Sequence, residues 1–116
     1  QVVKEFVEDN DLKRADVAYF EALVKGASAQ KPALWDEVVK YLDRESSQID
    51  PVEESILLLG AFELKDQLQV PFKVVISEAV DLAKIFGATD SYKYVNSILD
   101  KVAAVYRSVE VGAVSA

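Results

Sequence analysis

The sequence predicts an all-α protein, and three observations support this fold class. Apolar residues recur with a helical period in every segment, whereas the period-2 alternation of strands is scarce. The chain has only four glycines and few hairpin signals. Each of its prolines, Pro32, Pro51 and Pro71, stands where a helix can begin. We therefore expect a bundle of helices.

The first half of the chain is expected to contain three helical segments. Val2 to Val7 have the pattern of the last turns of an amphipathic helix, so we interpret the chain as a fragment that continued upstream of Gln1. A second helix is predicted over 13–29, with Leu23 and Ala27 on its apolar face. Pro32 then begins a short helix, whose apolar stripe consists of Leu34, Trp35, Val38, Val39 and Leu42.

The clearest helix start is at Asp50 and Pro51. Asp50 can cap the helix, Pro51 suits its first position, and Glu53 stands where the acid of a capping box would reach back. The helix that follows is apolar on nearly all sides, with Ile56, Leu57, Leu58, Leu59, Ala61, Phe62 and Leu64. We predict that it runs through the centre of the bundle.

Two further helices complete the predicted domain, which covers 1–108. The first begins at Pro71 and ends near Phe86, where Gly87 is expected to supply a left-handed residue. Asp90 or Thr89 is expected to cap the second, whose buried stripe is Val95, Ile98, Leu99, Val102 and Tyr106. Residues 109–116 have no pattern and are predicted to be a flexible C-terminal tail.

The composition limits the classes of function. A chain of 116 residues that is 51% hydrophobic and 28% charged is expected to fold as a single domain. The sequence has no apolar run of membrane-spanning length and no secretory start, so we expect a cytoplasmic location and no membrane contact. Cysteine and histidine are absent, which removes disulfides, thiolate nucleophiles, Cys/His zinc sites and Ser-His-Asp chemistry. We therefore predict neither an enzyme nor a cofactor.

Two groups of acidic residues could suggest sites. The run from Glu8 to Asp11 lacks the Gly and the final Glu that a calcium loop needs, so no metal site is predicted. The pairs Glu53 with Glu54 and Glu63 with Asp66 could suggest catalytic carboxylates, but acids on helix surfaces are far commoner than active sites. We predict no catalytic residue.

The stretch KIFGATDSYKYVNSILDKVA, from Lys84 to Ala103, is the strongest candidate for a binding surface. Lys93 and Tyr94 follow Asp90 by one turn at a helix N-terminus, where backbone N–H groups favour phosphate and an exposed ring can stack on an unpaired base. In the alternative interpretation, Asp90 only caps the helix while Tyr92 and Tyr94 cover the end of the bundle. The net charge of −7 opposes binding to a polyanion, so both interpretations stay open on these residues alone.

Three segments, DVAYFEALVKG, DPVEESILLLGAFEL and VPFKVVISEAVDLAKIFGATDSYKYVNSILDKVA, resemble the NusB family of bacterial transcription antitermination factors. The resemblance runs in order, with little need for gaps, from about Phe6 to Arg107. Its most specific part is the closing signature of Phe-Gly, an acid, Ser, Lys, an aromatic, Val-Asn and Leu-Asp-Lys. The resemblance implies an all-helical fold of two packed subdomains without enzymatic activity.

The resemblance also implies partners and site residues. It implies a heterodimer with NusE, a small-subunit ribosomal protein, and joint binding of the single-stranded boxA element of nascent RNA. The assembly would modify RNA polymerase so that it reads through terminators, notably in ribosomal RNA operons. Asp90, Lys93 and Tyr94 match positions at the RNA surface of the family, and Glu53 and Glu63 match acids on the helix that faces NusE. Acids there would suit a basic partner.

Two departures from the family pattern affect these expectations. The Arg-rich first helix of the family, a principal RNA contact, has no counterpart here, and Leu58 stands where many members have Arg. If that helix is absent, apolar surface is exposed, and we expect a marginally stable or self-associating chain; a homodimer also stays open. The alternative functions are a NusB-like protein-interaction module without RNA binding, and the NusB-like domain of an rRNA cytosine methyltransferase.

Overall fold

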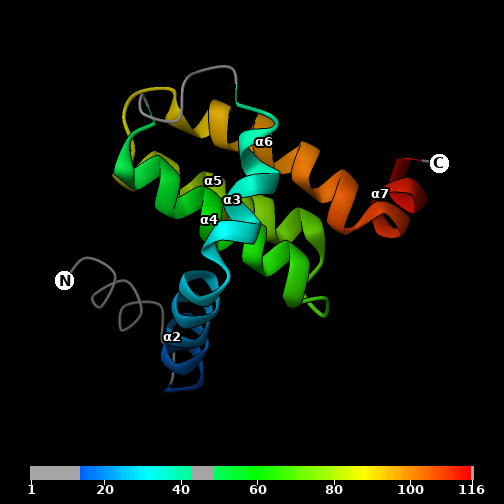
Figure 1. The fold of residues 1–116 in the computed structure, drawn as a ribbon, viewed down its shortest axis with the longest axis horizontal. Coiled ribbons are helices and arrows are strands. Elements are labelled where there is room, and N and C mark those ends of the chain that lie inside the picture. The colour runs from blue at the N-terminus through cyan, green and yellow to red at the C-terminus, as the bar shows by residue number, and fades with distance from the viewer. Residues whose placement is uncertain (1–13, 43–48, 116) are drawn as a thin grey trace.

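The fold is a bundle of α-helices. The computed structural model describes residues 14–42 and 49–115, and its helices are α2 (Arg14–Ala29), α3 (Lys31–Val39), α4 (Pro51–Asp66), α5 (Phe72–Phe86), α6 (Ser91–Tyr106) and α7 (Ser108–Ser115) (Figure 1). The described residues contain no strand, which confirms the all-α prediction. The helix remnant predicted near Val2 to Val7 and the acidic run from Glu8 to Asp11 lie outside the described residues. Within the described ranges, no helix has both the length and the apolar character needed to cross a membrane.

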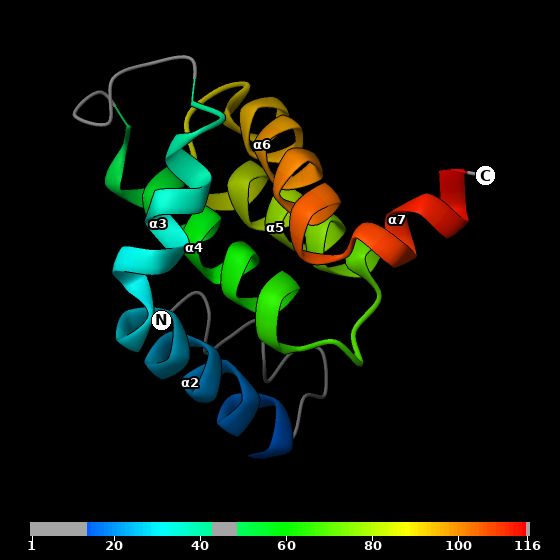
Figure 2. The same ribbon diagram turned by 45° about the vertical axis from the view of Figure 1, so that its right-hand side comes forward.

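Helix α4 lies at the centre, as its apolar surface predicts. It packs against α2, α3, α5 and α6, and Figure 2 shows α2 and α3 on one side of it and α5 and α6 on the other. Its Leu57, Ala61 and Leu64 are completely buried. Its start is also as predicted, because the Asp50 carboxylate accepts the Val52 N–H at 2.6 Å. Helices α4, α5 and α6 pack on one another and form the larger group, whereas α2 and α3 each pack mainly on α4.

Helices α5 and α6 form a hairpin that closes the larger group. The buried faces of the two helices carry Val75, Ile76, Ala79 and Ala83 on α5 and Val95, Ile98, Leu99 and Val102 on α6. Helix α6 also packs closely on α4, because a Cβ added at Gly60 would lie 2.8 Å from Leu99 Cδ1. The position of α6, and therefore of its first turn, is fixed by contacts along its whole length.

Residues 109–115, which fall in the segment predicted as a flexible tail, lie in helix α7. Helix α7 is held by Glu110, whose Oε2 accepts the Phe72 N–H at 2.9 Å and whose Oε1 accepts from Arg107 Nη1 at 2.7 Å. The bond from the Phe72 N–H, followed by the bond from Arg107, lowers the pKa of Glu110. Glu110 thereby caps the N-terminus of α5 from a position 38 residues later in the chain.

Arg107 ties this end of the molecule together. Its buried guanidinium donates to four carbonyl oxygens at the end of α4 and in the following loop, those of Leu64 (2.6 Å), Val70 (2.8 Å), Gln67 (2.9 Å) and Glu63 (3.2 Å). We call these contacts, with the ion pair to Glu110, the Arg107 joint. The cation also complements the negative end of the α4 dipole.

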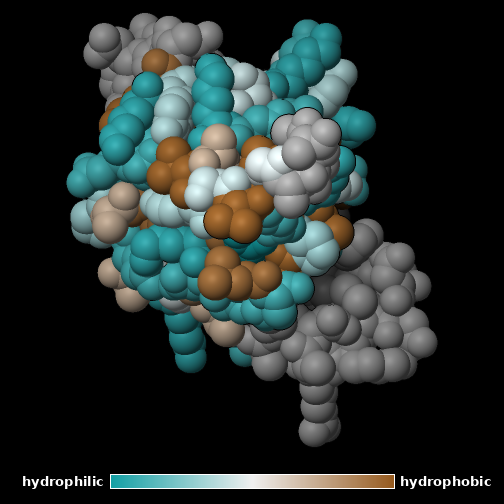
Figure 3. Space-filling model, turned by 90° about the vertical axis from the view of Figure 1, so that its right-hand side faces the viewer, coloured by the Kyte–Doolittle hydropathy of each residue, from teal (hydrophilic) through white to brown (hydrophobic). Residues whose placement is uncertain are grey.

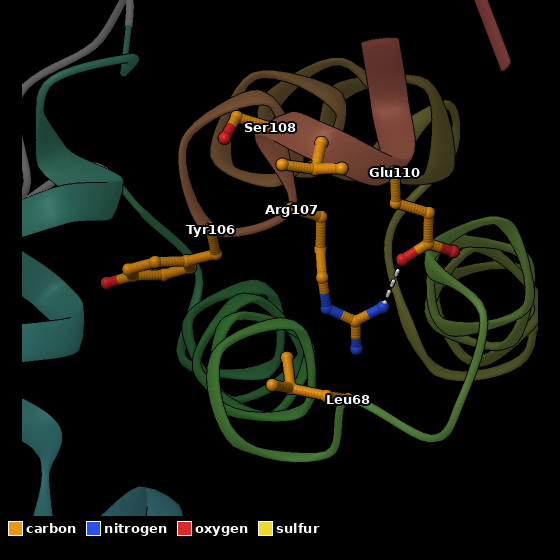
Figure 4. Close-up of a pocket in the computed structure, with 6 residues that line it drawn as sticks. Leu68, Tyr106, Arg107, Ser108 and Glu110 are labelled. Carbon is orange, nitrogen blue, oxygen red and sulfur yellow. Dashed lines mark hydrogen bonds and ion pairs between the residues drawn. The ribbon is translucent and has the colours of Figure 1, made fainter. Parts of the chain in front are cut away.

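A hollow of about 310 Å³ lies beside the joint, lined by Leu68, Tyr106, Arg107, Ser108, Val109 and Glu110 (Figure 4). Leu68 and Val109 are strongly exposed there. Figure 3 looks onto the end of the molecule at which α7 lies, and it shows hydrophobic patches separated by polar side chains. Since the guanidinium already donates to protein groups, the hollow belongs to the joint and is not assigned a ligand.

Candidate nucleic-acid interface

The candidate interface begins at the turn that joins α5 to α6, yellow in Figure 1. The prediction that Gly87 is left-handed is wrong, because it has φ −88° and ψ 173°; the left-handed residue is Asp90, with φ 68°. Gly87 is needed for space, since an added Cβ would lie 2.7 Å from the Ala83 carbonyl oxygen and 2.8 Å from Ser91 Oγ. Aspartate is one of the few residues other than glycine that tolerate the left-handed region.

Asp90 occupies the N-cap position of α6, but it does not cap the helix with its side chain as predicted. Its left-handed backbone accompanies a different contact, an ion pair between Asp90 Oδ1 and Lys93 Nζ at 3.6 Å. Both side chains are about two-thirds exposed, at 66% for Asp90 and 65% for Lys93. Exposed pairs of this kind contribute at most about 1 kcal/mol, so Lys93 can exchange Asp90 for another anion at little cost.

The two tyrosines of this turn differ in their surroundings. Both are half-buried and pack against the core. Tyr94, the aromatic predicted to meet a base, has its hydroxyl oxygen buried. Tyr92 lies beside two ammonium groups, with Lys84 Nζ at 5.0 Å and Lys93 Nζ at 5.9 Å from its ring centroid. The structure therefore brings Lys93 together with Lys84 and Tyr92, two residues that the sequence interpretation did not select.

Glu53 is hydrogen-bonded to Ser91, which lies in the first turn of the candidate interface. It is 5% exposed, and its Oε2 accepts the Ser91 Oγ–H at 2.8 Å, which joins the first turn of α4 to the first turn of α6. Glu63 is likewise buried, with 7% exposure. Both acids had been predicted to face a protein partner, but the fold gives them interior positions because α4 is surrounded by other helices. Acids of α4 that do reach the surface in part are Glu54 and Asp66.

The described residues contain no group of three or more acidic, Cys or His side chains that could hold a metal ion. On the outer side of α5, Glu78 has a raised pKa, caused first by desolvation and then by the charge of Asp81. The positive charge of the candidate interface is local, because the net charge of the whole chain is −7.

Comparisons with known proteins agree on one family. The model of the NusB family matches residues 1–104. The transcription antitermination protein NusB of Pasteurella multocida is 51% identical over 100 residues, which are 86% of this chain and 69% of that protein. The protein of the same name from Hahella chejuensis is 45% identical over 113 residues, 97% of this chain and 76% of that protein.

A solved structure agrees with this likeness. The structure of T. maritima NusB superposes with a TM-score of 0.73 at 28% sequence identity, over 85% of this chain and 70% of that chain. The likeness therefore holds both for the sequence and for the arrangement of helices.

Proposed function

This chain belongs to the NusB family, and we propose that it is a cytoplasmic transcription antitermination factor that pairs with NusE and binds boxA RNA. The complex would act on RNA polymerase during transcription of ribosomal operons. The observation that carries this proposal is the family match over residues 1–104, because its relatives are named as transcription antitermination proteins.

The local chemistry of the α5–α6 turn supports the RNA part of the proposal. Lys93 and Lys84 supply exposed positive charge next to an aromatic ring, which is the combination that single-stranded nucleic acid favours. Asp90 fixes the left-handed turn that places Lys93 and pairs with it at 3.6 Å. Tyr94 would contribute through the part of its ring that the core does not cover.

The protein partner is the less constrained part of the proposal. Because Glu53 and Glu63 are buried, we propose that they shape α4 while its partly exposed acids, Glu54 and Asp66, meet a basic partner. Lys31 lies 3.7 Å from Glu54 in the free chain and would have to yield to the cations of the partner.

The test is a fluorescence-anisotropy titration of labelled boxA RNA, and of a scrambled RNA of equal length, with and without NusE. The proposal predicts preferential binding of boxA that strengthens when NusE is added. Equal affinity for the two RNAs in both conditions would refute sequence-specific recognition.

A second candidate function is a protein-interaction module of the same family that binds no RNA, and the net charge of −7 favours it. That function predicts binding to NusE without any change in the anisotropy of either RNA. Measuring NusE binding directly, by calorimetry on the same samples, separates the two candidates.

A further inference from the structure

Tyr92 lies close to two lysines that come from different helices. Lys84 lies in the last turn of α5 and Lys93 in the first turn of α6, with their Nζ atoms 5.0 Å and 5.9 Å from the ring centroid. We propose that Tyr92 is the base-stacking residue of the RNA-binding surface, and that Lys84 and Lys93 hold the phosphates on either side of the stacked base. This inference rests on the proposed RNA-binding function.

The choice of Tyr92 over Tyr94 follows from helix geometry. Two positions apart on a helix is a rotation of about 200°, so the two rings leave α6 on nearly opposite sides. The buried hydroxyl oxygen of Tyr94 shows that its ring tip enters the protein. The Tyr92 ring is approached by two exposed lysine side chains, so a solvent-borne ligand that meets these lysines also meets the Tyr92 ring.

A base can displace an ammonium group from the ring because both the ring and the ammonium group then make a stronger contact. An exposed cation–π contact changes an equilibrium constant by about two- to five-fold. Stacking of a base on an aromatic side chain is worth about five- to 150-fold. A displaced ammonium group then meets a phosphate, which attracts it more strongly than a ring does. The described part of the chain places no acid in an ion pair with Lys84, so this lysine is available for that role.

The turn is already ordered for this contact. The Gly87 N–H donates to the Ala83 carbonyl at 2.8 Å and the Ser91 N–H donates to the Ala88 carbonyl at 3.0 Å. The buried bond from Ser91 to Glu53 then fixes the first turn of α6 on α4. A base that stacks on Tyr92 therefore meets a surface that needs little further ordering, which favours affinity.

The experiment compares variants of the full chain in the boxA titration, with NusE present. Tyr92→Leu removes the aromatic face and keeps an apolar side chain, while Tyr92→Phe keeps the ring. Tyr41→Leu, at another half-buried tyrosine, is the matched control. We expect Tyr92→Leu to weaken boxA binding by about five- to 150-fold, and Tyr92→Phe and Tyr41→Leu to bind as the unaltered chain does. A folded Tyr92→Leu variant with unaltered affinity would overturn the inference.

The salt dependence of binding separates the stacking role from the phosphate role. Losing one phosphate contact reduces the slope of log K against log salt by about 0.7 for a single strand. Lys84→Gln should show this reduction, Tyr92→Leu should keep the slope, and Lys101→Gln, at an exposed lysine further along α6, should change neither slope nor affinity. An unchanged slope for Lys84→Gln would refute its phosphate contact.

Photo-crosslinking of the unaltered chain to boxA RNA that carries 4-thiouridine tests the inference without any variant. A crosslink to Tyr92, mapped by mass spectrometry, supports it, and crosslinks confined to other residues overturn it. If the unaltered chain with NusE binds no RNA at all, the proposed function fails and this inference fails with it. RNA binding that is insensitive to Tyr92 refutes this inference alone.

Discussion

Replacing Arg107 by Met is expected to destabilise the fold strongly. The side chain is only 3% exposed, and its guanidinium donates to four carbonyl oxygens and to Glu110. Methionine fills a similar volume but has no donor, so the change isolates the hydrogen bonds from the packing. The carbonyls that lose their donor lie at the end of α4 and in the loop before α5, where the backbone offers few substitutes.

The size of the effect follows from the number of carbonyls left without a donor. Glu63 keeps a bond from the Gln67 N–H and Gln67 keeps one from the Val70 N–H, both at 3.0 Å, so two carbonyls, those of Leu64 and Val70, lose most. Leaving a buried acceptor unsatisfied costs about 1–3 kcal/mol. The adjoining hollow lets water enter, which favours the lower value for each of the two carbonyls and gives about 2 kcal/mol in total. That is a large share of the roughly 5–15 kcal/mol by which domains are stable.

Urea unfolding followed by far-UV circular dichroism measures this change. Arg107→Lys should fall between the unaltered chain and Arg107→Met, because one ammonium group keeps the charge but cannot reach all of the carbonyls. Lys101→Met, at an exposed lysine of α6, is the control for replacing a cation by methionine. A loss below about 1 kcal/mol for Arg107→Met would refute the assignment of the joint as a main support of this end of the fold.

Three further predictions concern the turn and α7. Gly87→Ala should lower the free energy of unfolding by about 1–3 kcal/mol, because the new Cβ would meet the Ala83 carbonyl oxygen. The control is Asp90→Gly, which removes a left-handed non-glycine residue and should not share this loss. Equal losses for the two variants in urea unfolding would contradict the steric argument. Ser91→Ala takes one hydrogen bond from the buried Glu53 carboxylate and should cost about 1–3 kcal/mol in the same assay, whereas Ser97→Ala, at an exposed serine of α6, should be nearly neutral. The pKa of Glu110 is lowered from its ordinary value of 4.5, so its stabilising contribution is present above that value and is lost as the pH falls through the folded-state pKa. The stability difference between the unaltered chain and Glu110→Gln should therefore shrink between about pH 7 and about pH 3, and a constant difference would contradict the role of the carboxylate.

Local signals in the sequence predicted the helices well. The cap at Asp50 and the prolines in the first turns of α3 and α4 act on neighbouring backbone, so their effect can be predicted without the rest of the fold. Pro71 is the N-cap residue of α5, one position before its first helical residue. The apolar surface of α4 likewise predicted its central place.

The details that the sequence did not predict depend on contacts between distant segments. Glu53 sits at a capping-box position, but it bonds Ser91, which is 38 residues away. Helix α7 has no clear apolar stripe and depends on the bond from Phe72 to Glu110. A glycine at position 87 is typical of a left-handed helix end, yet glycine is required there because Ala83 and Ser91 pack closely against it.

The sequence indicated the turn that we propose as the RNA-binding site, but it did not single out Tyr92, the stacking residue that we propose. Asp90 and Lys93 lie in the expected turn, whereas the pairing of Lys84 with Tyr92 arises only because the α5–α6 hairpin brings a last turn beside a first turn. Their separation of eight positions, across a turn that contains Gly87, was the signal that could have suggested the contact. The interior positions of Glu53 and Glu63 were not foreseeable from spacing, since both residue types are usually exposed.

The Arg107 joint also limits when during folding its own contacts can form. The carbonyl of Leu64 and the side chain that binds it are separated by 43 residues, so the joint closes a long loop, and it cannot form on a ribosome until the segment through Arg107 has emerged. Contacts that form after the rate-limiting step leave the folding rate almost unchanged and mainly slow unfolding. If the helices of the larger group associate first, the joint slows unfolding, and so lengthens the lifetime of the native state, without speeding folding.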